Sequence, residues 1–438
     1  MKRVLQTIMV LLCVSQLLAQ PYAQTETSKQ IGKKIVGYIP SYRMGKFNPN
    51  QLDYLSDIIV FSIFPDPITG KIGIHSTVKG KAIYKNIKGG KGLKQVDLEK
   101  VITESQKRGV KVHICVGGGD YSIPFRELVK NNKESQLAKD LALFCENYDI
   151  DGVDIDWEFP KNYDDYLKMK QLLTVLHTTL SPDKISLSAA FANNRTSQPY
   201  SIKVAKDCAH MLEMINVMGY VDTFNGVKIA KDVFVNYCKI PREKVIAGVP
   251  FYTCGPRKRP TRGVPYEKLL TLAKDASVTV SPAQNSVRIG TLNYVYNGVE
   301  RLKDKAKYSI KELGGLMIWE LGQDVSPLDD KYSLLRAIHS EMSKSTVTPT
   351  PSSPTVVTCK VYPNPFIEYL TFNFLKKGNY KIAIFNQTGR KVNEWNPKIN
   401  VPMRIRRRVS STGGKGVYRV VITDQSGVVV LRKGLVRN

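Results

Sequence analysis

The chain has 438 residues, 42% of them hydrophobic, which excludes global disorder and fits two to three domains. Its net charge of +27 raises the question of an anionic partner. The charge is uneven, because residues 355–438 carry 16 Lys and Arg against three Asp and Glu.

The N-terminus has the pattern of a secretory signal peptide. Lys2 and Arg3 precede an apolar run over residues 8–18 that is too short to span a membrane. Small residues at Ala19 and Ala23 predict cleavage between about 19 and 24. We therefore assign residues 1–24 to a signal peptide and expect export. Export permits disulfides, so both free thiols and one or two disulfides stay open for the six later cysteines.

Short β-branched runs alternate with amphipathic segments over residues 31–345. We expect strands at 34–39, 58–64, 110–116, 152–157, 185–191, 214–220, 245–251 and 315–319. We expect helices at 96–108, 135–148, 163–180, 227–238, 298–313 and 329–343. Eight β–α repeats predict an α/β fold, a (β/α)8 TIM barrel. A doubly wound open sheet is the weaker alternative, because no Gly-rich phosphate turn is present.

The composition then changes twice. Residues 346–356 are rich in Pro, Ser and Thr and predict a linker. Residues 357–438 predict a small C-terminal β-sandwich, with strands at 369–374, 380–386, 418–423 and 428–431.

The most informative stretch is DGVDIDWEFP, residues 151–160. Alternate residues of a strand point to opposite faces, so Asp154, Asp156 and Glu158 share one face with Cα atoms spaced by about 6.6 Å. The opposite face is wholly apolar. Burying such an acidic row without partners is unfavourable, so we expect it to line a cavity inside the barrel.

Other site chemistries have little support in the sequence. The acidic row lacks the glycine and polar spacers of a calcium loop. The five histidines have no ligand spacing, so we predict neither a metal nor a cofactor. The basic run 404–408 lacks interleaved aromatic residues, so we expect no nucleic-acid binding.

The stretch resembles the D-x-x-D-x-D-x-E signature of glycoside hydrolase family 18, the chitinase family, with its last acid at Glu158. Four further segments resemble motifs on the third, sixth, seventh and eighth strands of that family, namely residues 115–119, 216–220, 248–252 and 314–324. The resemblance implies a secreted, endo-acting hydrolase of β-1,4-linked N-acetylglucosamine polymers. Its family is an exception to the two-carboxylate scheme, because the substrate's own acetamido group attacks.

The resemblance also implies the catalytic roles. Glu158 protonates the glycosidic oxygen and later activates water, and Asp156 orients the acetamido group. Asp154 holds Asp156 and shares a proton with it, while Tyr220 donates to the acetamido oxygen. Like charges this close raise one another's pKa, which favours a protonated Glu158.

Five residues are expected to bind the substrate: Trp319, as the floor under the reacting sugar, with Tyr38, Phe61, Met218 and Gly118. Two positions depart from the family pattern. Cys115 replaces a serine, which predicts weaker support for Asp154. Val221 stands where the family often has an aspartate, and Asp222 follows it.

The segment 253–313 has 61 residues and must hold a loop and a helix. It is short for the α+β insertion of many processive chitinases. We therefore expect an open cleft and endo-acting cleavage.

The C-terminal module, with VYPNPF at residues 361–366, resembles the sorting domain of the Bacteroidetes type IX secretion system. This implies secretion machinery as a partner and export through periplasm and outer membrane to a secreted or cell-surface location. We expect a monomer. Two other functions stay open: an endo-β-N-acetylglucosaminidase acting on N-glycans or peptidoglycan, and a non-catalytic chitin-binding lectin.

Overall fold

The computed structural model describes residues 33–72, 93–119, 121–220, 224–255, 260–345, 359–362, 366–386, 388–401, 403–410, 414–427 and 429–437. The predicted signal peptide, the whole of the predicted linker, Val221 and Asp222 lie outside these residues.

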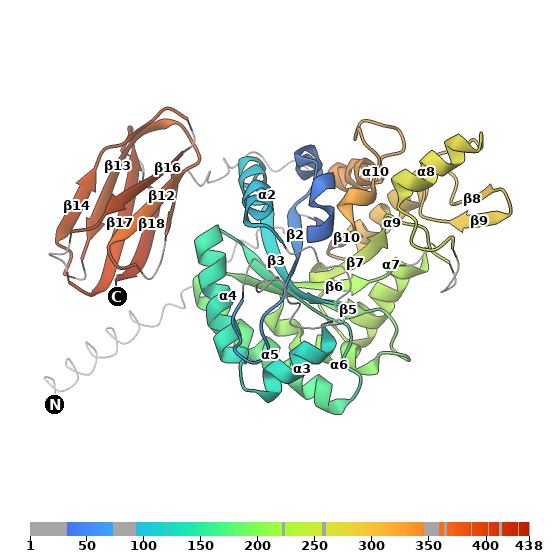
Figure 1. Cartoon of the computed structure of the whole chain (residues 1–438), viewed down its shortest axis with the longest axis horizontal. Helices are drawn as coiled ribbons and strands as arrows, with labels where there is room; N and C mark the ends of the chain where they lie inside the picture. Colours follow the sequence, from blue (N-terminus) through green and yellow to red (C-terminus); the bar gives the residue numbers. More distant parts are fainter. Residues whose placement is uncertain are drawn as a thin grey trace, which may run out of the picture. The chain divides into compact units, whose positions relative to one another are not determined.

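Eight parallel strands close into a barrel in the order β1-β10-β7-β6-β5-β4-β3-β2. This confirms the (β/α)8 fold, and Figure 1 shows the helices around the strands. The strands are β1 (Lys34–Pro40), β2 (Asp57–Ile63), β3 (Lys111–Gly118), β4 (Gly152–Trp157), β5 (Ser186–Ala192), β6 (Met214–Met218), β7 (Val245–Pro250) and β10 (Gly315–Trp319).

The expected helices are present with shifted ends. They are α2 (Gln95–Arg108), α4 (Glu134–Tyr148), α5 (Tyr163–Leu180), α9 (Val299–Glu312) and α10 (Leu334–Met342). The segment expected at 227–238 forms α7 (Asn225–Ala230), which continues as a π-helix, η5 (Lys231–Tyr237). Two further helices, α3 (Ser122–Lys130) and α6 (Pro199–Cys208), were not predicted from the sequence. Helix α2 ends as predicted at Gly109, whose φ of 69° is left-handed and suits glycine.

One expectation is wrong. The segment between β7 and α9 does contain a small α+β insertion, made of α8 (Tyr266–Asp275) and a hairpin of β8 (Ser286–Ile289) and β9 (Leu292–Val295). Tyr266 and Tyr296 are buried with ring centroids 5.6 Å apart, which ties the helix to the end of the hairpin. The hairpin escaped detection because its strands have only four residues each and are mostly exposed.

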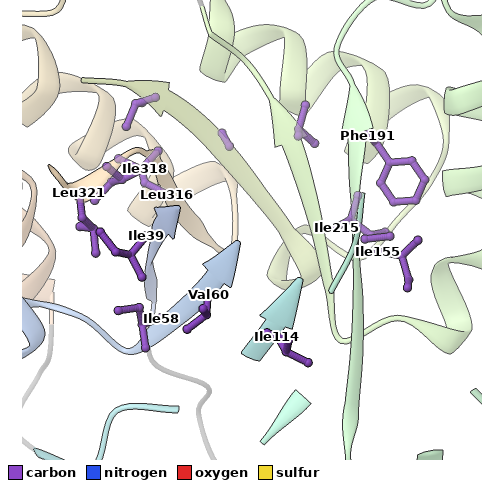
Figure 2. Packing of buried hydrophobic residues seen from close by; sticks show 14 of the residues in the cluster. Ile39, Ile58, Val60, Ile114, Ile155, Phe191, Ile215, Leu316, Ile318 and Leu321 are labelled. Atoms are coloured by element: carbon purple, nitrogen blue, oxygen red, sulfur yellow. The ribbon is translucent and has the colours of Figure 1, made fainter. Parts of the chain in front are cut away.

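The barrel strands are buried on both faces. Side chains that point outward form the main core with the helices, and Figure 2 shows part of this core, including Ile114, Ile155 and Ile318. The inward side chains form a smaller cluster that includes Tyr38, Cys115 and Met317, with Trp319 against it. This two-sided burial explains why these strands read as continuous apolar runs.

A buried polar cluster lies at the N-terminal ends of the strands, opposite the end where barrel enzymes place their chemistry. Asp57 contacts Lys34 Nζ at 3.1 Å and His113 Nε2 at 2.9 Å. Glu213 contacts the same Lys34 Nζ at 3.2 Å. The cluster satisfies the charges of side chains that the barrel removes from water.

The C-terminal module contains two antiparallel sheets, consistent with the predicted sandwich. One has the order β11-β12-β16, and the other has β14-β13-β17-β18 with β15 paired to β13. The strands are β11 (Cys359–Tyr362), β12 (Tyr369–Phe374), β13 (Gly378–Phe385), β14 (Lys391–Trp395), β15 (Lys398–Ile399), β16 (Met403–Arg408), β17 (Gly416–Asp424) and β18 (Val429–Arg437). Their inward residues form a separate core.

The six cysteines from Cys115 onward are all buried thiols, and none of them is joined in a disulfide in the described structure. This decides between the two alternatives that the sequence left open. In the described part of the chain, no helix has the length and apolar character needed to cross a membrane.

Candidate active site

The acidic row of β4 points into the barrel, as its alternation predicts. Val153, Ile155 and Trp157 belong to the core between strands and helices, and the Trp157 ring stacks on Phe125 at 5.1 Å. Asp154 is fully buried on the opposite face. Asp151, the first acid of the signature, instead accepts a hydrogen bond from the Val112 N–H at 2.8 Å and so lies at the start of the strand.

Asp154 is well supported, which corrects the expectation drawn from Cys115. The Ser188 hydroxyl donates to Oδ1 at 2.6 Å, and Asn216 Nδ2 donates to the same oxygen at 3.0 Å. The Tyr38 hydroxyl donates to Oδ2 at 2.8 Å. The Cys115 thiol adds a hydrogen bond of its own. Donors from four strands therefore fix this carboxylate.

Two of the groups that donate to Asp154, the Tyr38 hydroxyl and the Cys115 thiol, keep their protons. Burial, and next the negative charge of Asp154, raises the pKa of both Tyr38 and Cys115 well above the ordinary values. Each group therefore remains a donor to Asp154 over the physiological pH range.

Asp156 is buried beside Glu158 and forms a side-chain hydrogen bond with it. Burial, then the charges of Glu158 and Asp154, raises the pKa of Asp156 well above its ordinary value. Asp156 Oδ1 has no hydrogen-bond partner in the described structure. The pair therefore shares a proton and leaves one acceptor oxygen available.

Asp156 and Glu158 open onto a cavity of about 420 Å³ at the C-terminal ends of the strands. Barrel enzymes place their chemistry at this face. Its other lining residues are Tyr38, Phe159, Ala190, Ala192, Asn193, Gln198, Met218, Tyr220, Tyr252, Arg262 and Trp319. Within the described residues, no group of three or more His, Cys, Asp or Glu is arranged to hold a metal ion.

Trp319 stands at the end of β10 on an aromatic support. Its ring lies 4.8 Å from Phe61, edge to face, and 5.5 Å from Tyr38. Phe61 and Gly118 do not line the cavity but lie behind Trp319. A Cβ on Gly118 would come within 2.8 Å of the Phe61 ring, and its φ of 131° also favours glycine. These two residues therefore position the tryptophan.

Tyr220 and Met218 come from β6 and the turn after it, and both line the cavity. The Tyr220 hydroxyl donates to the Met317 sulfur at 3.6 Å, which is a weak acceptor. Burial, then Tyr252, raises the pKa of Tyr220 well above its ordinary value. The phenol therefore remains a donor that a better acceptor in the cavity could attract.

Sequence reasoning missed Ser188, Asn216, Gly119, Tyr252 and Arg262. Strand alternation could have found Ser188 and Asn216, because both are polar residues on the inward face of a barrel strand. A Cβ on Gly119 would lie 3.6 Å from Glu158 Oε1, so glycine keeps space beside that acid. Tyr252 and Arg262 line the cavity from the segment after β7.

A closed (β/α)8 barrel with a carboxylate-lined cavity at the C-terminal ends of its strands defines an enzyme-type TIM barrel. Residues 34–324 match the model of Glycosyl hydrolases family 18, and the chain belongs to this family. Residues 360–437 match the Secretion system C-terminal sorting domain. Both matches confirm the resemblances seen in the sequence.

Known relatives agree with this assignment. Probable chitinase 10 of Drosophila melanogaster is 28% identical over 131 residues, 27% of this chain and 6% of that protein. Endochitinase 1 of Metarhizium robertsii is 23% identical over 276 residues, 51% of this chain and 64% of that protein. The chain thus spans less than two thirds of the length of either relative. A chitinase structure from Bacillus thuringiensis shares the fold, with a TM-score of 0.59 and 17% identity over 92% of this chain and 84% of that one.

Proposed function

We propose that this protein is a secreted glycosidase that cleaves β-1,4 bonds between N-acetylglucosamine units, in chitin or chitooligosaccharides, by substrate-assisted retention. The observation that carries the proposal is the hydrogen-bonded pair of Asp156 and Glu158 at the edge of the 420 Å³ cavity, with Trp319 in its wall. Family membership and the names of the relatives agree with this chemistry.

Glu158 is the proposed general acid. It protonates the glycosidic oxygen as the sugar's acetamido oxygen attacks the anomeric carbon, and the resulting carboxylate then activates water. The shared proton of the Asp156–Glu158 pair lies on Glu158 once Asp156 accepts a hydrogen bond from the acetamido N–H. The partnerless Oδ1 of Asp156 supports that acceptor role.

Other residues hold the sugar and its carboxylates. Asp154, fixed by Ser188 and its neighbours, stabilises the position and charge of Asp156. Tyr220 donates to the acetamido oxygen in place of the weak Met317 contact. The exposed face of Trp319 stacks on the C–H groups of the reacting sugar, and Met218 and Tyr38 complete that subsite.

Three broader parts of the proposal rest on the sequence. Residues 1–24 act as a signal peptide, 31–345 as the hydrolase barrel, 346–356 as a linker and 357–438 as the sorting domain. The sorting domain directs export by type IX secretion to the surface or medium. We also propose that the protein acts as a monomer.

Endo-acting cleavage remains the proposed mode, and its products test it. Chitohexaose cleaved at several internal bonds gives a mixture of products from the earliest times. Release of dimers alone from one chain end would instead indicate processive cleavage. In that case we would expect the insertion formed by α8, β8 and β9 to deepen one wall of the substrate cleft.

The central experiment is hydrolysis of chitooligosaccharides, and of an N-glycosylated protein, by wild type and by Glu158→Gln. General acid catalysis contributes about 10²- to 10⁴-fold, so we expect a loss of that order in the variant. Glu127→Gln on α3 is the matched control, because that side chain is half exposed and pairs with Lys130 at 3.8 Å, away from the cavity lining. If wild type and Glu158→Gln are equally inert yet bind the oligosaccharides, the protein is a lectin and the catalytic proposal fails.

A further inference from the structure

We infer that the outer edge of β16 in the C-terminal module binds an extended acidic segment of a partner protein by strand addition. The inference goes beyond the proposed sorting role, because it names the surface and the chemistry that recognise the partner. It does not depend on the proposed hydrolysis.

Strand β16 carries three arginines on one face. Its pairing with β12 places Arg404 opposite Asn373, Arg406 opposite Thr371 and Arg408 opposite Tyr369. All three arginines are exposed, whereas Ile405 between them points into the core of the sandwich. Residues two apart on a strand are separated by about 6.6 Å, so the guanidinium groups form a regular cationic row.

These charges have few acidic partners. Arg408 contacts Glu368 at 3.4 Å, and both side chains are largely exposed. The guanidinium of Arg406 lies over the Tyr369 ring at 4.3 Å, which orients it without neutralising its charge. No carboxylate contact is recorded for Arg404 or Arg406 within the described residues.

The same arginines present their backbone groups at an open edge. In the described structure β16 is the last strand of its sheet, with β12 as its neighbour on one side only. The Val409 N–H donates to the Glu368 carbonyl at 2.7 Å, so that facing pair is hydrogen-bonded. Hydrogen-bonded and non-hydrogen-bonded pairs alternate in an antiparallel ladder, so the N–H and C=O groups of Arg404, Arg406 and Arg408 face away from β12.

One contact agrees with this orientation. The Arg406 carbonyl accepts a hydrogen bond from the Arg407 side chain at 3.1 Å, so a side chain and not a neighbouring strand occupies this acceptor. A strand that pairs with this edge would displace that side chain and gain regular backbone hydrogen bonds.

The geometry specifies the occupant. Residues of an incoming strand that face Arg404, Arg406 and Arg408 project on the same side as the arginines, so Asp or Glu at every second position forms three cross-strand ion pairs. A second copy of β16 would bring arginine against arginine, which disfavours self-association at this edge. The edge therefore fits a partner strand with alternating acidic residues and disfavours pairing with β16 of a second copy of the chain.

The test uses the purified full chain and a fluorescent peptide with three glutamates at alternate positions of a Thr/Val sequence. We expect binding in fluorescence anisotropy that weakens at high salt. Reversing the arginines together, Arg404→Glu, Arg406→Glu and Arg408→Glu, should lower the affinity at least tenfold. The matched control reverses three exposed cations outside β16, Arg390→Glu, Lys398→Glu and Lys415→Glu, and should leave the affinity within twofold.

Two further measurements keep the inference falsifiable. A peptide with the same charges but N-methylated backbone amides on the pairing edge should bind at least tenfold more weakly, because it cannot add a strand. Equal binding of both peptides would show a purely electrostatic surface and overturn the inference. The variant Arg404→Lys, Arg406→Lys, Arg408→Lys keeps the charges and controls for misfolding of the charge-reversed variant. It should retain peptide binding. Loss of binding at an unchanged melting temperature would contradict the charge argument.

Peptide binding at β16 and hydrolysis of chitooligosaccharides can be tested independently of each other. Loss of peptide binding with intact chitooligosaccharide hydrolysis would reject only the role of β16. Peptide binding by a protein that does not hydrolyse chitooligosaccharides would leave this inference in place.

Discussion

The Ser188 hydroxyl and Asp154 Oδ1 lie 2.6 Å apart, and the two residues face each other in register on neighbouring strands β5 and β4. This contact compensates for the weak Cys115 donor on the other side of β4, where Cys115 faces the same aspartate. The buried carboxylate therefore has a stronger donor on β5 than on β3.

Ser188→Ala should lower kcat about tenfold with little change in KM, because a buried charged group that loses one hydrogen bond is destabilised by about 1–3 kcal/mol. Ser188 does not line the cavity, so it acts through Asp154 as a positioning residue. Steady-state kinetics on a chromogenic chitooligosaccharide measure the split. Ser340→Ala on α10, which removes only a hydroxyl that donates to the Ala337 carbonyl, is the control. A rise in KM alone would place Ser188 in substrate binding instead.

The sequence could predict what depends on one strand, but not what depends on register between strands. The alternation of residues 152–158 alone predicts an acidic face and an apolar face, because the period of a strand is fixed. Which residue lies opposite Asp154 depends on how β3, β4 and β5 align, and no local pattern encodes that alignment. Alternation alone places Ser188 on the inward face of its strand, but its hydrogen bond to Asp154 depends on this register and could not be predicted.

The strand β16 was missed for a different reason. Its sequence, MRIRRR, has one apolar residue that is buried, Ile405, so the alternation that marks a half-buried strand is nearly absent. Tertiary pairing with β12 makes it a strand in spite of its charges.

The thiols of the six described cysteines should not react with Ellman's reagent in the native protein. All six are buried, and burial raises the pKa of the Cys208 thiol to about 12 and that of Cys238 to about 11, so little thiolate forms at pH 8. The same six should react together after denaturation without reductant. Fewer reactive thiols in the denatured state would indicate disulfides and contradict this arrangement.

Asp57→Asn should lower the free energy of unfolding by about 3–5 kcal/mol at pH 7, because it breaks a buried charge cluster and leaves Lys34 uncompensated. Burial alone would raise the pKa of Asp57, but the hydrogen bond and charge of His113 and the charge of Lys34 outweigh it and hold the pKa far below the ordinary value. The folded state therefore gains stability above the unfolded pKa of about 3.9 and loses it as the pH falls further.

Urea unfolding at pH 7, 4 and 3 measures this effect. The gap between wild type and Asp57→Asn should begin to shrink between pH 4 and pH 3, because the wild-type advantage falls off below the unfolded pKa and is fully lost only below the much lower folded pKa. Asp53→Asn is the control, because Asp53 pairs with Arg108 at 2.9 Å on the surface and should change stability by less than about 1 kcal/mol. A gap that stays constant from pH 7 to pH 3 would count against the proposed role of Asp57.

Asp156→Asn should stabilise the protein at neutral pH while it removes most of the activity. Because burial and the charges of Glu158 and Asp154 raise the pKa of Asp156, the folded state binds its proton more tightly than the unfolded chain does. Stability from this group is therefore fully present below the unfolded pKa of about 3.9 and is lost as the pH rises toward the folded pKa. Asparagine has a similar shape and never ionises, so the advantage of the variant should grow between pH 4 and pH 7.

The activity should move in the opposite direction. Asparagine cannot carry the negative charge that stabilises a cationic intermediate, so we expect turnover to fall about 100-fold or more, as for other preorganised electrostatic groups. Thermal unfolding at pH 4 and pH 7, measured beside turnover, tests both parts on one variant. Asp164→Asn, at the exposed start of α5, should leave both quantities nearly unchanged. A variant less stable than wild type at pH 7 would indicate that Asp156 is ionised in the folded protein. That result would contradict a proton shared between Asp156 and Glu158.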